Sequence, residues 1–337
     1  MVSSRPRLTP AVADVRRAVR DLLPDSGVVV VALSGGPDSL AVASALAFEG
    51  PRAGLETGAV VVDHQLQQGS DAVAEQAAQQ ARDLGLGHVR IVRVTVAGSG
   101  GPEAAARAAR YDALSAVAAE LGAAAVLLGH TLDDQAETVL LGLARGSGST
   151  SLQGMARVAG LYRRPLLGIR RSTTVQACAD AGLEPWIDPH NSDRAYTRVR
   201  VRETVLPVLE AELGPGVADA LVRTADQLRE DSQALDAFAE EVAEDLAEHI
   251  EAGIALPVAA LAANPSALRQ RLIRYVVFSE FGVSLSRAHT VEAARLVTDW
   301  HGQEGVDLPG VRVVRRGSSL EFTAREKSSE ESSGGDV

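Results

Sequence analysis

The sequence predicts an α/β fold, a doubly wound parallel sheet followed by a smaller, mostly helical domain. Apolar, strand-like runs alternate with helical patterns over the first part of the chain, as in a parallel sheet covered by helices. Past Thr150 this alternation stops and helical patterns dominate. The 337 residues are enough for two domains. We expect a sheet domain at 1–215, a helical domain at 216–325 and a disordered polar tail at 326–337.

Four strands and four helices make up the alternating part. Strands are expected at 27–33, 58–64, 88–96 and 123–130. A helix follows each strand, the first ending at Phe48 and the others spanning 70–84, 102–122 and 132–146. Ligands of such sheets bind beyond the carboxyl ends of the strands. We therefore expect three segments to face one crevice: Ser34–Ser39, Asp63–His64 and Gly129–Asp134.

The remainder of the chain is richer in loops and then in helices. A short helix is expected near 172–182, and a long acidic amphipathic helix at 217–250, where it would connect the two domains. The stretch "VDLPGVRVVRRGSSLEF" predicts a closing hairpin.

Composition limits the compartment and the class of partner. Cys178 is the single cysteine, which excludes an intramolecular disulfide and a cysteine-built metal cluster. No window reaches the roughly 18 apolar residues of a membrane span. We predict a cytoplasmic protein without a membrane partner; its oligomeric state, a homodimer included, stays open. The net charge of −11 argues against a diffuse basic sheath for nucleic acid but leaves room for local arginine patches.

The stretch "SGGPDS" joins the first strand to its helix and predicts an anion-binding loop. Consecutive N–H groups in a glycine-rich turn at a helix N-terminus form a concave cradle for phosphate. Gly35 and Gly36 let the backbone approach a ligand, and Ser34 and Ser39 add hydroxyl donors. The stretch lacks the Lys-Ser/Thr ending of a mononucleotide P-loop. Asp38 beside a phosphate suggests a bridging cation, for which Mg²⁺ is the natural choice.

The loop resembles the pyrophosphatase loop of ATP-dependent adenylating enzymes, and later motifs narrow the resemblance. Together, "VVVDHQL", "EAAARAARYDAL", "LLGHTLDDQAETVLLGLARGSG", "RPLL" and "WIDPHNSDRAYTRVRVR" resemble the tRNA(Ile)-lysidine synthetase family, densely over 27–210 and more loosely to 322. The resemblance implies an adenine nucleotide alpha hydrolase-like fold. It also implies ATP-dependent ligation of free L-lysine to C2 of the wobble cytidine of tRNA(Ile) with a CAU anticodon. An adenylated tRNA would be the intermediate, pyrophosphate and AMP the products, and the codon read would change from AUG to AUA.

The resemblance also assigns roles to residues of this chain. ATP binding falls to Ser34, Gly35, Gly36, Pro37, Asp38, Ser39, Asp63, His64 and His130, and the catalytic set is Asp38, Arg107, Arg110, His130, Asp134 and Glu137. Asp38 and Asp133 would hold Mg²⁺. Asp134 and Glu137, three apart on one helix face, would hold the lysine ammonium, because two buried like charges are costly without a cation. Without the resemblance, Asp133, Asp134 and Glu137 are also consistent with acidic residues that stabilise a helix N-terminus. Arg107 and Arg110 are then also consistent with a solvated helix face.

Two arginine clusters have the character of phosphate contacts: Arg163, Arg164, Arg170 and Arg171 around the proline of "RPLL", and Arg194, Arg198, Arg200 and Arg202 further along the chain. The predicted tRNA contacts among them are Arg164, Arg194, Arg198, Arg200 and Arg202. Spacing by two with valines between predicts a strand edge with arginines on one side. Asp188 and Asn191 match the Asp-Pro-x-Asn of the family before the second cluster. The sequence departs from the family pattern at Gln65 and Gln67, and at Val199, where the family has asparagine. In the second domain the expected contacts to the tRNA stem are Arg269, Arg271, Arg274, Arg315 and Arg316.

Three other functions share the nucleotide loop. A sulfur-transferring tRNA enzyme needs cysteines or an iron–sulfur cluster, which one cysteine in a predicted helix does not suit. An amide-forming synthetase that uses glutamine-derived ammonia needs a glutaminase arrangement, which is not visible here. A nucleotide sensor without catalysis would leave His130 and the carboxylates unexplained.

Overall fold

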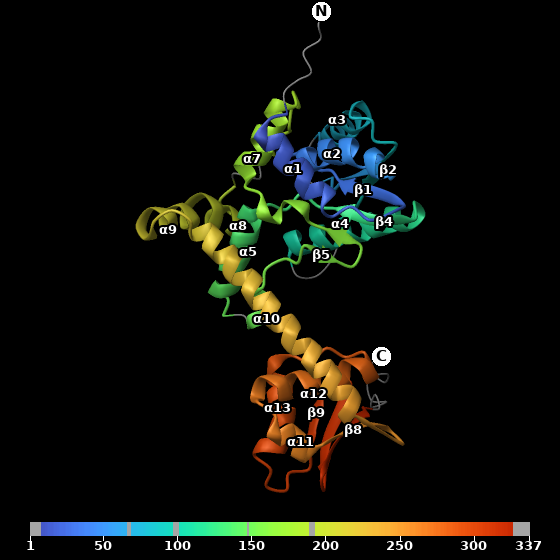
Figure 1. Ribbon diagram of the computed structural model, residues 1–337, viewed down its shortest axis with the longest axis vertical. Helices are drawn as coiled ribbons and strands as arrows, with labels where there is room; N and C mark the ends of the chain where they lie inside the picture. The colour runs from blue at the N-terminus through green and yellow to red at the C-terminus, as the bar shows by residue number, and fades with distance from the viewer. Residues whose placement is uncertain (1–7, 66–68, 97–100, 147, 189–192, 326–337) are drawn as a thin grey trace, which may run out of the picture. The chain divides into compact units, whose positions relative to one another are not determined.

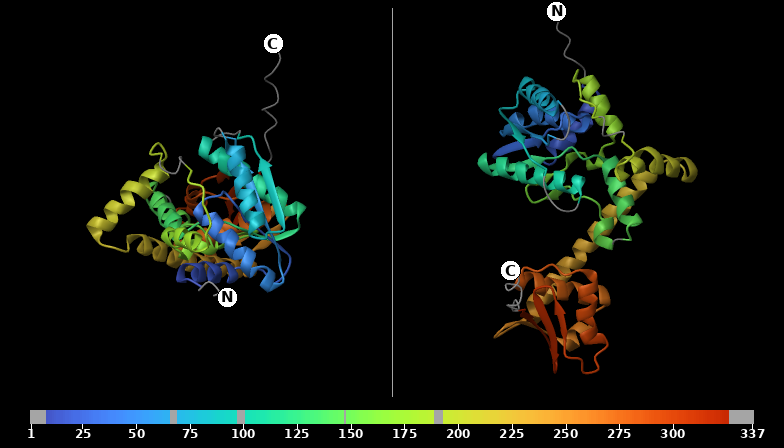
Figure 2. Two further views of the ribbon diagram at one scale, coloured as in Figure 1. Left: turned by 90° about the horizontal axis from the view of Figure 1, so that it is seen from above. Right: turned by 180° about the vertical axis from the view of Figure 1, so that it is seen from behind.

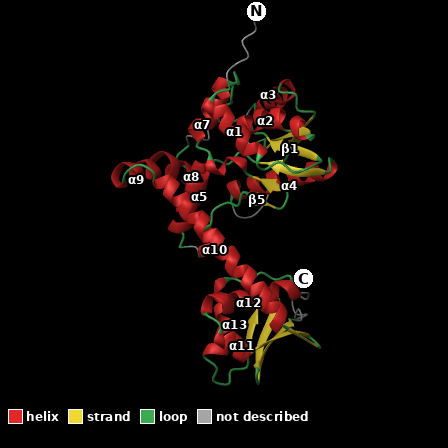
Figure 3. Ribbon diagram, in the orientation of Figure 1, coloured by secondary structure: helices red, strands yellow, loops and turns green. Residues whose placement is uncertain are grey.

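The computed structural model describes residues 8–65, 69–96, 101–146, 148–188 and 193–325. They belong to two compact units, unit 1 (Met1–Asp226) and unit 2 (Gln227–Val337) (Figures 1 and 3). The units divide within α10 (Val217–Leu246), whereas the predicted domain boundary stands just before that helix. The predicted disordered tail at 326–337 lies outside the described residues.

Unit 1 contains a six-stranded sheet in the order β3-β2-β1-β4-β6-β5, in which all neighbours are parallel except β5 and β6. This confirms the predicted fold class. The strands are β1 (Val28–Ala32), β2 (Glu56–Asp63), β3 (His88–Arg93), β4 (Ala123–Leu127), β5 (Val158–Ala159) and β6 (Tyr162–Arg163). β3 is shorter than the predicted 88–96 because β2, its partner, ends at Asp63, which pairs with Arg93. Val94 and Val96 have no strand beside them to extend the ladder.

Helices cover both faces of this sheet because the central strands are apolar on both sides. Val29 and Val31 of β1 pack into one core with α1, α2, α3 and α7, and Val30 packs into a second core with α4. The helices are α1 (Pro10–Arg20), α2 (Pro37–Glu49), α3 (Ser70–Asp83), α4 (Pro102–Glu120), α5 (Leu132–Ala144), α6 (Ser149–Leu152) and α7 (Arg171–Asp180), with short 3-10 turns η1 (Pro51–Ala53) and η2 (Pro165–Gly168). The parallel strands end at one edge, from which the loops after β1, β2 and β4 emerge.

The last part of unit 1 is a helical arm that lies apart from the sheet in each view (Figures 1 and 2). It comprises α8 (Thr197–Arg200), the π-helical turn η4 (Val201–Val205) and α9 (Leu206–Leu213). Val201 and Leu206 of the arm pack with Leu132 and Ala136 of α5, which fixes the base of the arm against the sheet domain.

Unit 2 combines helices with a five-stranded antiparallel sheet in the order β7-β8-β11-β10-β9. Its strands are β7 (Glu248–Ile250), β8 (Gly253–Pro257), β9 (Val306–Leu308), β10 (Val311–Arg316) and β11 (Ser319–Ala324), and its helices after α10 are α11 (Val258–Ala263), α12 (Ser266–Phe281) and α13 (Arg287–Thr298). The predicted closing hairpin is the β10–β11 pair, while β7 and β8 were not predicted. None of the described helices combines the length and apolar character needed to cross a bilayer.

Candidate active site

The loop Ser34–Ser39 is held in shape by its own two serines. The Ser39 hydroxyl accepts the Ser34 N–H (3.1 Å) and donates to the Gly36 carbonyl (3.0 Å), and Gly35 has a φ of +80°. α2 starts at Pro37 with Gly36 as its N-cap, and no described side chain caps the first turn. The N–H groups and the positive end of α2 therefore stay available to an anion.

Gly129 lets the loop after β4 approach this turn closely. A Cβ atom at Gly129 would lie 2.8 Å from the Ser39 nitrogen and 2.9 Å from the Asp38 carbonyl carbon. Any side chain at this position would therefore force the two loops apart. The Trp186 N–H donates to the Gly35 carbonyl (2.9 Å) and ties the segment after α7 to the same turn. Two of the three predicted crevice segments thus meet at the ends of β1 and β4.

Three arginines, which we call the cationic cluster, lie near the ends of β4 and β6: Arg107, Arg110 and Arg164. Arg107 and Arg164 donate to the Tyr111 hydroxyl (3.3 and 3.4 Å), and Arg164 also donates to the Ala156 carbonyl (2.9 Å). Within the described part of the chain, none of the three forms an ion pair with a carboxylate. Burial, reinforced by the charges of Arg107 and Arg164, lowers the pKa of Arg110.

His64 and His130, the two histidines predicted at strand ends, lie beside the cationic cluster. Burial and the charge of Arg110 lower the pKa of His130 from 6.5 to about 3, and the same two causes lower the pKa of His64. The Nδ1 atoms of both rings are buried and have no hydrogen-bond partner in the described structure. Uncompensated positive charge beside neutral, unpartnered imidazoles is typical of a site that binds an anion.

Asp134 and Glu137, on the first turns of α5, contact three arginines. Asp134 Oδ2 accepts the N–H and the hydroxyl of Thr131, both at 2.8 Å, as part of a capping box. Glu137 is fully buried and accepts from Nε (2.7 Å) and Nη2 (3.1 Å) of Arg202, while Arg198 lies 3.5 Å away. Burial acts to raise the pKa of Asp134, but Arg171 and the Thr131 donors outweigh it, so this pKa lies below its usual value.

Arg171, the first residue of α7, and its N-cap residue Arg170 also contact two further carboxylates, Asp133 and Asp38. Arg170 and the N–H of Arg171 bind the two oxygens of Asp133, at 3.2 and 2.7 Å. Arg171 Nε lies 3.4 Å from one oxygen of Asp38, whose other oxygen accepts the Thr174 hydroxyl. Burial nevertheless raises the pKa of Asp38. This carboxylate is therefore short of positive charge.

These contacts define a second group of side chains, the balanced cluster, in which carboxylates and guanidiniums are paired: Asp38, Asp133, Asp134 and Glu137 with Arg170, Arg171, Arg198 and Arg202. Arg170 also pairs with Asp219 of α10, which brings a fifth carboxylate to its edge. The cation that the sequence analysis assigned to a lysine substrate is supplied here by the chain itself. Among the described residues, no three His, Cys, Asp or Glu side chains gather as a metal site. A carboxylate such as Asp38 suits a Mg²⁺ ion that also takes phosphate oxygens. In both Asp38 and Asp133 each oxygen already faces a donor, so a bound Mg²⁺ ion would displace one of these donors.

The predicted strand edge at 194–202 is wrong, because this segment enters the helical arm. Arg198 and Arg202, four residues apart in the helix, share one face and both reach Glu137. Val201, between them and turned inward, packs with α5. Alternation of Arg and Val fits a strand locally, but burial against α5 selects the helix.

The predicted tRNA contacts separate into three places. Arg164 is 7 % exposed and belongs to the cationic cluster, and Arg198 and Arg202 belong to the balanced cluster. Arg194 is exposed, and Arg200 is exposed and donates to the Arg194 and Ala195 carbonyls (2.7 and 2.8 Å). Asn191 and Gln67, which the sequence analysis named, lie outside the described residues.

Comparison with known proteins places both units. The family model described as the PP-loop domain matches residues 10–209, and that of the TilS substrate binding domain matches 256–320. A tRNA(Ile)-lysidine synthase from Leifsonia xyli subsp. xyli is 63% identical over 301 residues, covering 89% of this chain and 91% of that protein. Another from Thermobifida fusca is 53% identical over 304 residues, covering 90% and 93%.

The chain belongs to the tRNA(Ile)-lysidine synthase family. Its fold recurs outside the family, in the U34-tRNA thiolase NcsA from Methanococcus maripaludis with its [4Fe-4S] cluster. The TM-score is 0.55 at 20% identity, over 65% of this chain and 80% of that one. At that identity the likeness concerns the fold alone.

Asp63 forms a tight turn after β2 with Gln65, one of the positions at which the chain departs from the family pattern. Asp63 is 3 % exposed, and its Oδ1 accepts the Gln65 N–H (3.0 Å), while Gln65 takes a φ of +54°. The Asp63 carboxylate thus stabilises the turn that carries His64 toward the cationic cluster.

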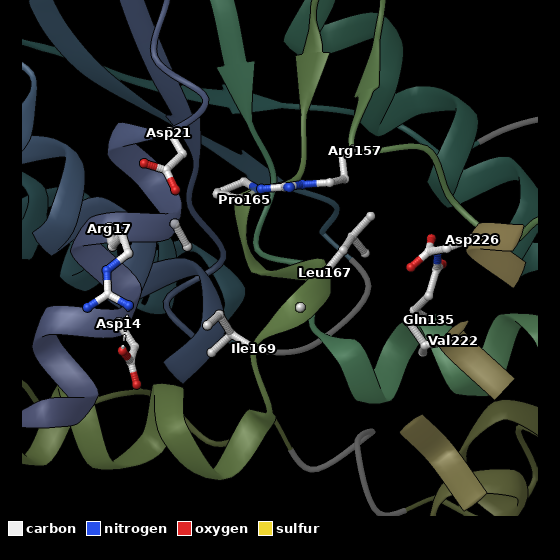
Figure 4. Close-up of a pocket in the computed structure, with 12 residues that line it drawn as sticks. Asp14, Arg17, Asp21, Gln135, Arg157, Pro165, Leu167, Ile169, Val222 and Asp226 are labelled. Carbon is white, nitrogen blue, oxygen red and sulfur yellow. Dashed lines mark ion pairs between the residues drawn. The ribbon is translucent and has the colours of Figure 1, made fainter. Parts of the chain in front are cut away.

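A separate cavity of about 310 Å³ lies between α1, η2 and the first turns of α10 (Figure 4). Asp14, Arg17 and Asp21 of α1 line one wall, and Gln135 lies across from them. The Gln135 amide donates to the Met155 carbonyl (2.9 Å) and accepts the Met155 N–H (2.7 Å), which supports the loop after α6. None of the residues predicted to act on ATP or lysine lines this cavity.

Arg170 and Arg171, at the start of α7, were expected to contact phosphates, and their carboxylate partners were not predicted; Thr174 was not predicted to belong to the site. The two arginines belong to the basic run around "RPLL", and that position was their only signal. The carboxylate partners of these three residues lie 34 to 136 positions away along the chain, so no local spacing relates them.

Proposed function

We propose that the protein ligates L-lysine to C2 of the wobble cytidine of CAU-anticodon tRNA(Ile), at the expense of ATP and through an adenylated tRNA. One observation carries the proposal: the loop built for phosphate adjoins the carboxylates suited to an amine, because Arg171 contacts Asp38, Asp134 and Glu137 together. The high identity to proteins named tRNA(Ile)-lysidine synthase supports the same reaction.

In the first step, the cytosine O2 attacks the α-phosphorus of ATP, and the bond to the β-phosphate oxygen breaks to release pyrophosphate. The main-chain N–H groups of the loop Ser34–Ser39 would hold the phosphates. Arg107 and Arg110 would stabilise the charge that develops at the α-phosphorus, beside the neutral His130. Mg²⁺, which we expect to bind with the nucleotide, would be held by Asp38 and would neutralise part of the phosphate charge. Asp133 would serve only after releasing Arg170 or the Arg171 N–H.

In the second step, a lysine amine attacks C2, and the C2–O bond breaks as AMP leaves with the oxygen. Adenylation matters because oxide is a very poor leaving group and AMP a good one. Asp134 and Glu137 would hold the lysine ammonium next to the reacting carbon, and one of the two carboxylates would take the proton that the nitrogen must lose before it attacks C2. The wobble base lies in a single-stranded loop of tRNA, where it can be extruded into a pocket.

The tRNA itself would contact both units. Arg194 and Arg200 are exposed on the surface of unit 1, where they would contact phosphates. The match of 256–320 to the TilS substrate binding domain supports a role for unit 2 in holding the tRNA.

Sulfur transfer, the reaction of the structural neighbour, is not favoured here. Cys178 donates its S–H to the Pro37 carbonyl (3.3 Å), and burial raises its thiol pKa to about 12. A neutral, enclosed thiol is a poor sulfur carrier.

The test separates the two steps. ATP/pyrophosphate exchange is measured with and without the CAU-anticodon tRNA, and incorporation of labelled lysine into the tRNA is measured in parallel. Asp38→Ala should abolish both signals, whereas Glu137→Ala should keep the exchange and lose lysine transfer. Glu120→Ala, at an exposed carboxylate of α4, is the matched control and should keep both. Failure of labelled lysine to enter this tRNA would refute the proposal.

A further inference from the structure

Arg171 occupies a position that no other described arginine shares. Its three guanidinium nitrogens each face a different carboxylate: Nη2 lies 2.7 Å from Asp134, Nε 3.4 Å from Asp38, and Nη1 3.6 Å from Glu137. Its N–H is anchored to Asp133 (2.7 Å), which fixes the start of α7. One side chain therefore joins the loop proposed for ATP to the carboxylates proposed for lysine.

Charge balance makes this position consequential. Asp134 and Glu137 together already contact three guanidiniums, those of Arg171, Arg198 and Arg202. A lysine ammonium at these two carboxylates would add a fourth cation in a largely buried place, where excess like charge is costly. Binding of lysine therefore requires one guanidinium to leave these two carboxylates.

Arg171 is the arginine with another anion to move to. Arg198 binds Glu137 and the Thr138 hydroxyl, and Arg202 binds Glu137 and Asp134, so both stay on α5. Arg171 alone of the three also contacts Asp38, on the first turn of α2, where the triphosphate is expected. Phosphate oxygens at that turn would compete for its guanidinium.

We propose that Arg171 is a positioning residue that makes lysine binding depend on bound nucleotide. Without nucleotide its guanidinium contacts Asp134 and Glu137 and weakens lysine binding. With nucleotide it turns to the phosphates, which withdraws one of the three guanidiniums that contact these two carboxylates and leaves room for the ammonium. The order of events follows, since the site accepts the amine strongly only when ATP is in place. This inference rests on the proposed function, because it assumes that ATP and lysine are the ligands.

The experiment measures lysine affinity by equilibrium dialysis on the full chain, with and without Mg²⁺ and α,β-methylene-ATP. The methylene bridge of this analogue prevents the transfer of its AMP group to tRNA. In the unmodified protein the analogue should tighten lysine binding about tenfold, and lysine should tighten analogue binding by the same factor. Arg171→Gln should bind lysine tightly in the absence of the analogue, and the analogue should change that affinity less than about twofold.

Two further variants separate coupling from structural damage. Arg171→Lys keeps the charge and should keep most of the dependence on nucleotide. Arg198→Gln removes a guanidinium from Glu137 but none from Asp38, so lysine affinity should change while the roughly tenfold effect of the analogue remains. If Arg171→Gln kept the full effect, or the unmodified protein showed none, the inference would be wrong while the proposed function stood. If lysine bound to no form of the protein, both would fail.

Discussion

The two arginine groups near the end of β4 differ in what neutralises them. The cationic cluster has no carboxylate partner among the described residues. Its arginines contact the Tyr111 hydroxyl and the Ala156 carbonyl, and the charges of Arg107 and Arg164 repel that of Arg110. In the balanced cluster every guanidinium contacts at least one carboxylate. The first group carries charge that the fold leaves unmatched, and the second carries charge that the fold has already matched.

The difference indicates how each group meets its ligand. Unmatched charge lowers stability where it is buried, as at Arg164 and in part at Arg110, and a bound anion compensates it, so the cationic cluster is prepared for direct binding. Matched charge contributes to stability, and a ligand there has to exchange for a partner already present. Substitutions in the first group should therefore affect activity more than stability, and substitutions in the second should affect both.

The largest effect is expected at Arg110. Arg110→Gln removes a charge from the cationic cluster and should lower the rate of tRNA adenylation about 100- to 1,000-fold, because that charge acts on the transition state. Its loss also relieves repulsion with Arg107 and Arg164, so resistance to urea should not fall. Pyrophosphate release and urea unfolding are measured on the same preparations. Loss of stability together with activity would mean that Arg110 is a structural residue.

Glu137 provides the opposite case within the balanced cluster. Glu137→Gln removes a fully buried carboxylate, which leaves Arg198 without a carboxylate partner and Arg202 with Asp134 alone, so the free energy of unfolding should fall by about 3 kcal/mol. Glu203→Gln is the matched control, because Glu203 pairs with the exposed Arg194 at 3.7 Å and its loss should cost at most about 0.5 kcal/mol. Urea unfolding measures both. Similar losses at the two sites would remove the distinction between matched burial and surface pairing.

The pH dependence of stability tests the cationic cluster without ligand. His130 stays neutral in the folded protein down to about pH 3, whereas the unfolded chain takes up a proton below about pH 6.5. Stability should therefore fall as the pH drops from 6.5 toward 3, by up to about 1.4 kcal/mol per unit from this group. In His130→Asn the slope between pH 6.5 and 5 should be smaller, because this side chain no longer takes up a proton on unfolding.

The control for this slope is His301→Asn, at an exposed histidine of unit 2. It should leave the dependence of unfolding free energy on pH unchanged. His64, whose pKa is also lowered, keeps its own contribution in both variants. If His130→Asn had the same slope as the unmodified protein, the imidazole would not be held neutral by the neighbouring arginines.

Local pattern was enough to predict the sheet and the loop but not the pairing of charges. The valines of β1 and the SGGPDS turn predict a strand, a cradle and a helix, because their determinants lie within a few residues of one another. The end of β3 depends on where β2 ends, which no pattern within 88–96 records. Likewise, Arg171 and Arg202 read as surface arginines until the fold brings Asp38, Asp134 and Glu137 to them.

The predicted tRNA arginines divide for the same reason, and Arg194 gives the smallest expected effect. Its side chain is 67% exposed, so Arg194→Gln should weaken tRNA binding only about threefold. The slope of log K against log [salt] should become shallower by about 0.7 to 0.9, as the loss of one phosphate contact predicts. Arg17→Gln, at a side chain of α1 that is 63% exposed, is the control and should change neither quantity. Filter binding over a salt series measures both. Equal effects at Arg17 and Arg194 would show that tRNA responds to the overall charge of unit 1. The segment that carries Arg194 into the helical arm would then have no special role in binding tRNA.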